Sequence, residues 1–202
     1  MAKSADEKRT KILETAKKRF AHYGMAKTTM AEIAKDLAFS KALLYYYFPD
    51  KISLYAAVME HIIEETKQSI EDSISKTTDE LEAINLLLER SMEFKKRYFY
   101  LLEYTFLIRK DLPADLDRLI FKSFGSHENI IQSILEKGVE AGRLIPMDAQ
   151  ENSRLFICST LGMRMSFLKD FKSDFIPDKS EFDAILDMQK KLAKIFIRGL
   201  QI

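Results

Sequence analysis

The chain has 202 residues, of which 47% are hydrophobic and 31% are charged, as is ordinary for a folded globular protein. A single cysteine, Cys158, excludes an internal disulfide and fits a reducing compartment. The charged N-terminus leads into no apolar stretch of signal-peptide type, and the most apolar run, at 98–108, is too short to cross a bilayer. We therefore expect a cytoplasmic protein with no membrane partner.

Charge is distributed unevenly, although the net charge is only +1. Residues 1–51 carry eleven Lys and Arg against six Asp and Glu, a net +5, whereas the other 151 residues carry 21 against 25, a net −4. A basic first quarter on an otherwise acidic chain indicates that the N-terminal part meets a polyanion. The competing explanation is chance clustering of charge in a short segment.

The low content of glycine and proline, six and four residues, favours long helices over many short strands. In the first segment apolar residues recur at helical spacing and stop at Gly24, a typical helix end. Thr29 begins a capping-box sequence, which predicts a short helix over 29–37. Ser40 can cap a second short helix over 41–48, which the following Pro-Asp pair ends.

Helical spacing continues to the C-terminus, with prolines at the breaks. The remaining predicted helices are 51–75, 79–97, 98–111, 114–142, 148–171 and 179–200. No alternating strand of convincing length, internal repeat or low-complexity segment interrupts them. The sequence therefore predicts an all-α fold of about nine helices, with one domain over 1–50 and a larger helical domain over 51–202.

The two short helices and the turn between them fit a helix-turn-helix. Ala34 is the small residue required where the helices cross, and Leu44 and Phe48 lie on the inward side of the second helix. Successive residues step about 100° around a helix, so Tyr45–Tyr47 cannot all face inward. A recognition helix places its N-terminal residues at base edges in the major groove, and a phenol hydroxyl can donate to a phosphate.

The second short helix is therefore expected to contact DNA. Its N-terminal residues would meet the backbone and base edges, its tyrosines the flanking backbone, and a lysine beyond it a phosphate at the start of the next helix. The predicted contacts are Ser40, Lys41, Ala42, Leu43, Tyr45, Tyr46, Tyr47 and Lys51. The competing explanation is that the tyrosines only pack this subdomain against the rest of the chain.

Residues 28–55, TTMAEIAKDLAFSKALLYYYFPDKISLY, resemble the DNA-binding signature of the TetR family of bacterial transcriptional regulators. The matching positions are Thr28-Thr29, Ile33-Ala34, Ser40, Leu44-Tyr45-Tyr46-Tyr47-Phe48, Lys51 and Leu54-Tyr55. The resemblance adds Thr28 and Thr29 to the DNA contacts. It implies a homodimeric repressor that leaves a palindromic operator in double-stranded DNA when a small, largely apolar inducer of unknown identity binds.

The sequence departs from the family pattern at two alanines. The family often has Gly in the turn where this chain has Ala38, and Gly or Pro where it has Ala42. An alanine in the left-handed conformation costs about 1 kcal/mol, so we expect an adjusted or strained turn. A methyl group at Ala42 would change how closely the helix approaches a base pair.

A dimer is expected because one recognition helix reads only a few base pairs, whereas two can enter successive major grooves about 34–36 Å apart. The last two predicted helices could pair with those of a second subunit in a four-helix bundle. The predicted interface residues are Leu155, Ser159, Gly162, Ser166, Ile185, Gln189, Leu192 and Phe196. The alternative is that both stripes belong to the core of one chain.

The middle of the chain is rich in Met, Phe and Tyr, which could enclose an apolar or aromatic ligand. The candidate ligand-binding residues are Phe94, Tyr98, Tyr104, Arg109, Phe124, His127, Met163 and Phe167. An ordinary hydrophobic core is the competing explanation at each of them. By the resemblance, ligand binding would shift the helix after Lys51 and so change the separation of the two recognition helices.

Two other classes of protein were weighed. An enzyme is opposed by the absence of GxG and HExxH motifs and by three histidines that lie far apart in sequence, and no catalytic residue, metal ligand or cofactor is predicted. A helical interaction module that has lost DNA binding would need a disabled recognition helix. The polar residues of that helix remain: Ser40, Lys41, Tyr45, Tyr47 and, just beyond it, Lys51.

Overall fold

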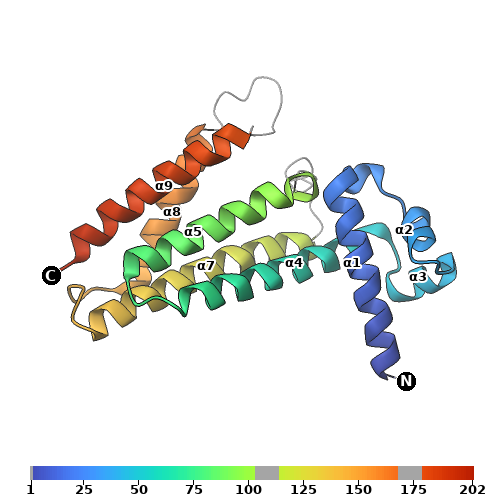
Figure 1. The fold of residues 1–202 in the computed structure, drawn as a ribbon, viewed down its shortest axis with the longest axis horizontal. Helices are drawn as coiled ribbons and strands as arrows, with labels where there is room; N and C mark the ends of the chain where they lie inside the picture. Colours follow the sequence, from blue (N-terminus) through green and yellow to red (C-terminus); the bar gives the residue numbers. More distant parts are fainter. Residues whose placement is uncertain (1, 103–113, 168–178) are drawn as a thin grey trace. The chain divides into compact units, whose positions relative to one another are not determined.

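The computed structural model describes residues 2–102, 114–167 and 179–202 (Figure 1). Within these ranges the chain forms eight helices and no named strand, so the all-α prediction is confirmed. The helices are α1 (Ala2–Lys27), α2 (Met30–Asp36), α3 (Lys41–Tyr47), α4 (Lys51–Ile74), α5 (Glu80–Arg97), α7 (Ala114–Glu140), α8 (Ala149–Phe167) and α9 (Lys179–Leu200). None of the helices in the described part is long and apolar enough to cross a membrane.

The observed boundaries follow the predicted ones within a few residues. One difference is in α1, which continues to Lys27 across a kink at Gly24, where the backbone has φ 77° and ψ 165°. Gly24 thus breaks the regular helix where a stop was predicted. The predicted helix over 98–111 falls largely outside the described residues, although 99–102 are helical.

The chain divides into two compact units. The first unit comprises residues 1–65 and 97–120, and the second comprises 66–96 and 121–202. The predicted domains were separated at residue 50, where the DNA-binding motif ends. The first unit extends further because α4 packs with α1.

The first unit is built around the packing of α1 on α4. Phe20 and Tyr55 are fully buried and meet edge to face, with ring centroids 5.6 Å apart. The Tyr55 hydroxyl donates to the carbonyl of Leu101 at 2.5 Å, which satisfies its polar group in the interior. Each buried aromatic or aliphatic side chain stabilises such a core by roughly 1.5–3 kcal/mol.

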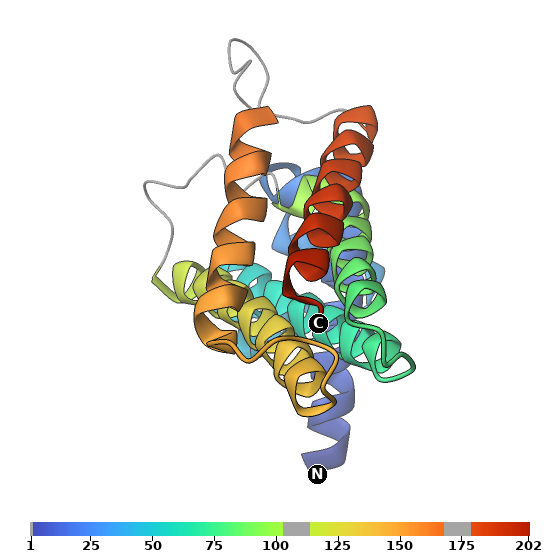
Figure 2. The ribbon, with the colours of Figure 1, turned by 90° about the vertical axis from the view of Figure 1, so that its left-hand side faces the viewer.

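The second unit has its own core from α5, α7, α8, α9 and the end of α4. Figures 1 and 2 show α8 and α9 side by side. The buried carboxylate of Glu80 accepts from the Arg143 guanidinium at 2.7 Å, which ties the start of α5 to the turn after α7. A Cβ at Gly138 would lie 2.6 Å from a Leu144 methyl carbon, so this close approach requires glycine.

The turn between α2 and α3 is a Schellman motif with an alanine at its left-handed position. The N–H of Phe39 donates to the Ala34 carbonyl at 2.9 Å, and the N–H of Ala38 donates to the Lys35 carbonyl at 3.1 Å. Ala38 has φ 53°, in the left-handed region that favours glycine. Ala38 therefore adopts the left-handed conformation without being glycine, at a cost of about 1 kcal/mol.

Ala38→Gly should raise the free energy of unfolding by up to about 1 kcal/mol, because relief of the left-handed penalty exceeds the entropic cost of a glycine. Urea denaturation of the full chain measures this. The matched control is Ala31→Gly, at an exposed position inside α2, which should lower the free energy of unfolding by about 0.5–1 kcal/mol. If both substitutions lower the free energy of unfolding by the same amount, Ala38 is not strained.

Candidate nucleic-acid interface

Both short helices begin with the caps that the sequence predicts. The Thr29 hydroxyl accepts from the Glu32 N–H at 3.3 Å, and the Glu32 carboxylate accepts from the Thr29 N–H at 2.9 Å, which completes a capping box. The Ser40 hydroxyl accepts from the Leu43 N–H at 3.1 Å and caps α3. Hydrogen bonds from Thr29, its side chain first, lower the pKa of the Glu32 carboxyl.

The inward side of the helix pair is apolar, as predicted. Ile33 and Ala34 of α2 and Leu44 of α3 are buried, together with Phe48 at the end of α3. Ala34 provides the small side chain where α2 meets α3. This packing fixes the rotation of α3 and therefore decides which of its residues reach solvent.

An ion pair fastens α2 to α1. The Arg19 guanidinium donates to the Asp36 carboxylate through Nε at 2.5 Å and through a second nitrogen at 2.9 Å. The hydrogen bond from Arg19 lowers the pKa of the Asp36 carboxyl. No local sequence pattern predicts this ion pair, because its partners are 17 residues apart.

The outward side of α3 presents tyrosine and lysine. Tyr46 is 81% exposed and Tyr45 is 49% exposed, while Lys41 and Ala42 also face solvent. Leu43 and Tyr47 are half-buried, and the Tyr47 ring lies edge-on to Tyr46 with centroids 5.4 Å apart. The prediction that the three tyrosines cannot all face inward agrees with this geometry. Their contact with DNA stays a prediction.

Two of the predicted DNA contacts have structural partners instead. Thr28 is fully buried and its hydroxyl donates to the Gly24 carbonyl at 2.9 Å, so its side chain has no exposed surface for a phosphate. A DNA contact by Thr28 stays a prediction, and it could not involve this buried hydroxyl. Lys51 donates to the carbonyls of Met25 and Thr28, each at 3.0 Å.

Lys51 therefore joins the start of α4 to the C-terminal end of α1 through hydrogen bonds. Its ammonium has three donors, and two of them satisfy carbonyls where the helix terminus carries partial negative charge. Asp50 caps α4 next to it, accepting from the Ser53 N–H at 2.7 Å, and this backbone hydrogen bond lowers the pKa of the Asp50 carboxyl. A phosphate contact by Lys51 stays a prediction.

The candidate ligand residues are divided between the two units. Tyr98 is buried in the first unit, where the Arg97 guanidinium lies 5.5 Å from its ring centroid. The half-buried Phe94, Met163 and His127 belong to the second unit, and the His127 Nε2 lies 2.9 Å from the Ser91 hydroxyl. Tyr104 and Arg109 lie outside the described residues, and only the helical backbone is described for Phe124 and Phe167.

Two of the predicted interface residues on α9 are covered by their own chain, whereas the interface role of the other two stays a prediction. Ile185 and Gln189 are only 2% and 5% exposed, and the Gln189 amide donates to the Thr160 carbonyl at 3.4 Å. Leu192 and Phe196 are half-buried against the same core, with the Phe196 and Phe156 ring centroids 5.1 Å apart. The apolar stripe of α9 faces inward because it packs on helices of its own chain.

The remaining predicted interface residues lie on α8 and are partly accessible. Leu155 is 58% exposed, Gly162 is exposed, and Ser159 is half-buried with its hydroxyl donating to the Leu155 carbonyl at 2.8 Å. Only the backbone of Ser166 is described. On α9 the solvent-facing apolar residues are instead Met188 and Ile195, the latter 71% exposed.

Comparison with known proteins agrees with this geometry. Residues 12–58 match the profile of the family described as "Bacterial regulatory proteins, tetR family". YhgD, an uncharacterized HTH-type transcriptional regulator of Bacillus subtilis (strain 168), is 25% identical over 186 residues, 92% of this chain and 95% of YhgD. The HTH-type transcriptional regulator RutR of Escherichia coli (strain K12) is 28% identical over 156 residues, 74% of this chain and 70% of RutR.

Solved structures show the same fold. A transcriptional regulator from Cytophaga hutchinsonii ATCC 33406 is 26% identical, with a TM-score of 0.83 over 95% of this chain and 97% of its own. A TetR-family transcriptional regulator from Pectobacterium atrosepticum is 20% identical, with a TM-score of 0.74 over 100% and 98% of the two chains, and so supports the fold alone. These relatives are transcriptional regulators and not enzymes. Residues 12–58 are thus similar to the DNA-binding region of the TetR family, and the chain is a DNA-binding, helix-turn-helix transcriptional regulator of TetR type.

Substitutions on the exposed side of α3 should weaken DNA binding while the fold is kept. Lys41→Ala should lower affinity for duplex DNA and reduce the slope of log affinity against log salt by about 1, because one phosphate contact is lost. Tyr46→Phe should cost about 1 kcal/mol of binding free energy through a lost hydrogen bond. Fluorescence anisotropy at two or more salt concentrations measures both.

The matched controls for these variants are Lys76→Ala and Tyr100→Phe, which change exposed residues of the same types outside the helix-turn-helix. Both controls should bind DNA as the unchanged chain does. If the α3 variants and the controls have the same affinity and salt slope, the assignment of α3 as the DNA contact is wrong.

Proposed function

We propose that this protein is a homodimeric repressor that binds a palindromic operator and leaves it when a small, largely apolar ligand binds. The observation that carries the proposal is the exposed tyrosine and lysine side of α3, held on a capped and packed helix-turn-helix. A module that had lost DNA binding would have no reason to keep Tyr46 81% exposed beside Lys41. Tyrosine in that position offers both a stacking surface and a donor for phosphate.

The dimer is supported by apolar residues left in solvent on α8 and α9. Leu155 and Gly162 are seven residues apart on α8, and Met188 and Ile195 are seven apart on α9, so each pair lies on one face of its helix. We call these four residues the α8–α9 surface. A Cβ built on Gly162 meets no atom within 4 Å, which leaves room for a partner helix to approach. Covering such residues gains about 25 cal/mol per Å² of apolar area.

Ligand release is supported by a polar pair inside the second unit. The Ser91 hydroxyl and the His127 imidazole lie 2.9 Å apart, on α5 and α7, two helices that also contribute apolar residues to the core of the second unit. A ligand's hydroxyl, carbonyl or carboxylate group could exchange with either partner and so be oriented. Such a ligand can release DNA only by binding the DNA-free arrangement more tightly than the DNA-bound one.

The dimer proposal predicts that Ile195→Lys yields monomers. A lysine there adds positive charge next to Lys191 and Lys194, and a two-fold axis would bring a second copy of this charge to the interface. Sedimentation velocity should give about twice 23.5 kDa for the unchanged chain and a single-chain mass for the variant. Site selection from random duplexes should return inverted repeats, with half-sites spaced by about one helical turn or a multiple of it.

The control for this experiment is Ile145→Lys, which changes an exposed isoleucine outside α8 and α9 and should remain dimeric. A dimeric Ile195→Lys variant would show that the α8–α9 surface is not the interface. Selected sites without two-fold symmetry would count against a dimeric repressor altogether.

The ligand proposal predicts a separation of functions at His127. The probe is any small apolar compound that lowers the affinity of the unchanged chain for the operator. His127→Ala should bind the operator with unchanged affinity. The concentration of compound needed to release the operator should be at least about tenfold higher for this variant. Anisotropy titrations with and without the compound measure this. An undiminished response would exclude His127 from ligand recognition.

A further inference from the structure

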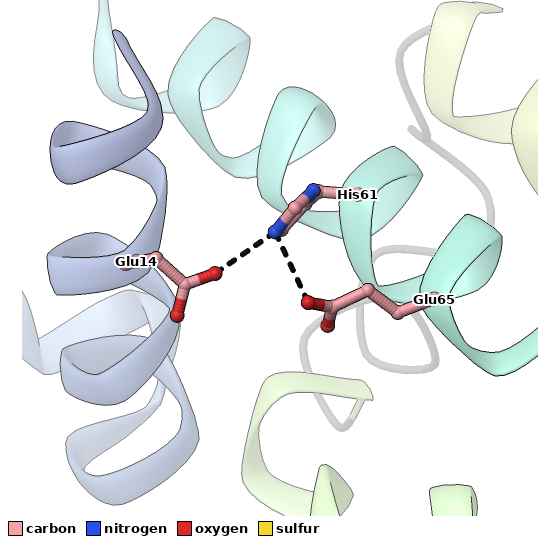
Figure 3. Close-up of side chains that lie close together, drawn as sticks. All are labelled: Glu14, His61 and Glu65. Atoms are coloured by element: carbon pink, nitrogen blue, oxygen red, sulfur yellow. Dashed lines mark hydrogen bonds and ion pairs between the residues drawn. The ribbon is translucent and has the colours of Figure 1, made fainter. Parts of the chain in front are cut away.

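A cluster of chargeable side chains lies in the first unit, where α1 passes α4, and DNA recognition does not use it (Figure 3). The His61 Nε2 lies 2.9 Å from the Glu14 Oε1 and 3.3 Å from the Glu65 Oε1. The Lys17 Nζ is 2.8 Å from the Glu14 Oε1 and 3.1 Å from the Glu65 Oε2. Figure 3 shows both carboxylates directed at the same imidazole nitrogen.

The three side chains Glu14, His61 and Glu65 are held by two helices and by no loop. His61 and Glu65 are four residues apart on α4, so they lie one turn apart on one face. Glu14 reaches them from α1, whose position against α4 is fixed nearby by the buried Phe20 and Tyr55. The ligand set is thus preorganised by the same packing that supports the helix-turn-helix.

The spacing of the ligand atoms fits a bound metal ion. One atom from each of Glu14, His61 and Glu65 can be chosen so that all lie within 4.8 Å of one another. Ligands at 2.0–2.1 Å from a tetrahedral ion lie about 3.3 Å apart, close to the two distances around the His61 Nε2. Small side-chain rotations are enough to close the set, and the partial exposure of all three residues leaves a path for the ion.

We propose that Glu14, His61 and Glu65 bind a divalent first-row transition ion of the Zn²⁺ type, with solvent completing the coordination. One imidazole nitrogen with two carboxylate oxygens suits such an ion, whereas Mg²⁺ and Ca²⁺ prefer oxygen ligands alone. The bound ion would join α1 to α4 by direct coordination bonds. No local sequence pattern predicts this site, because Glu14 and His61 are 47 residues apart in the chain.

Lys17 is the resident cation of this cluster and would compete with the metal. Burial opposes ionisation of Glu14, but hydrogen bonds from Lys17 and His61 outweigh it and lower the pKa of the carboxyl. Burial likewise opposes the charge on Lys17, and its bonds to Glu14 and Glu65 raise its pKa. The Lys17 ammonium brings one positive charge to the two carboxylates, whereas a divalent ion would bring two and bind them more strongly. Removing Lys17 should therefore strengthen metal binding.

The test is isothermal titration calorimetry of ZnCl₂ into the full chain near neutral pH. We expect one ion per chain, with affinity at least about tenfold weaker in Glu14→Gln and in His61→Gln. Lys17→Met should bind the ion as tightly as the unchanged chain or more tightly. The controls His22→Gln and Cys158→Ser remove exposed potential ligands elsewhere and should leave the affinity unchanged.

The proposed site is wrong if the unchanged chain does not bind Zn²⁺, or if His61→Gln binds Zn²⁺ as tightly as the unchanged chain. It is also wrong if a control variant loses Zn²⁺ binding, or if the unchanged chain binds Mg²⁺ as tightly as Zn²⁺. Circular dichroism shows whether each variant is folded, and Glu65→Gln replaces Glu14→Gln if the latter unfolds. Metal binding is read directly, so this result is independent of whether the chain proves to be a repressor.

Discussion

The packing of α1 against α4 is the interaction on which the DNA-binding half of the molecule depends. Tyr55 lies at its centre, fully buried, with its ring against Phe20 and its hydroxyl on the Leu101 carbonyl. Lys51 donates to one carbonyl in the last turn of α1 and to one just beyond it, and Arg19 of α1 holds α2 through Asp36. Because α3 is packed on α2, the orientation of the exposed tyrosines follows from how α1 and α4 meet.

The helix-turn-helix combines a well-satisfied backbone with one strained residue. Its caps and its Schellman hydrogen bonds provide partners for the orphan groups at the ends of two very short helices. Helices of this length are not stable alone, so their stability comes from tertiary packing of their inward faces. That packing also holds Ala38 in a left-handed conformation that the isolated turn would avoid.

Lysine serves three different purposes in the first unit. Lys51 neutralises the end of a helix, Lys17 balances two carboxylates between α1 and α4, and Lys41 faces solvent on the recognition helix. The positive charge of residues 1–51 is therefore not all directed at nucleic acid. Part of it is used in internal electrostatics, and the exposed remainder is what a phosphate backbone would meet.

The sequence alone determined the helices, their caps and the helix-turn-helix, because these depend on interactions between residues three or four positions apart. It also identified the exposed tyrosines, since the helical period forces neighbouring residues onto different faces. Only the tertiary structure decided that Thr28 is buried, that Ile185 and Gln189 belong to the core of their own chain, and that Glu14 meets His61. A stripe of apolar residues shows that a helix face is covered, but not which helix covers it. Contacts between distant segments depend on how whole helices pack, and no local pattern encodes that packing.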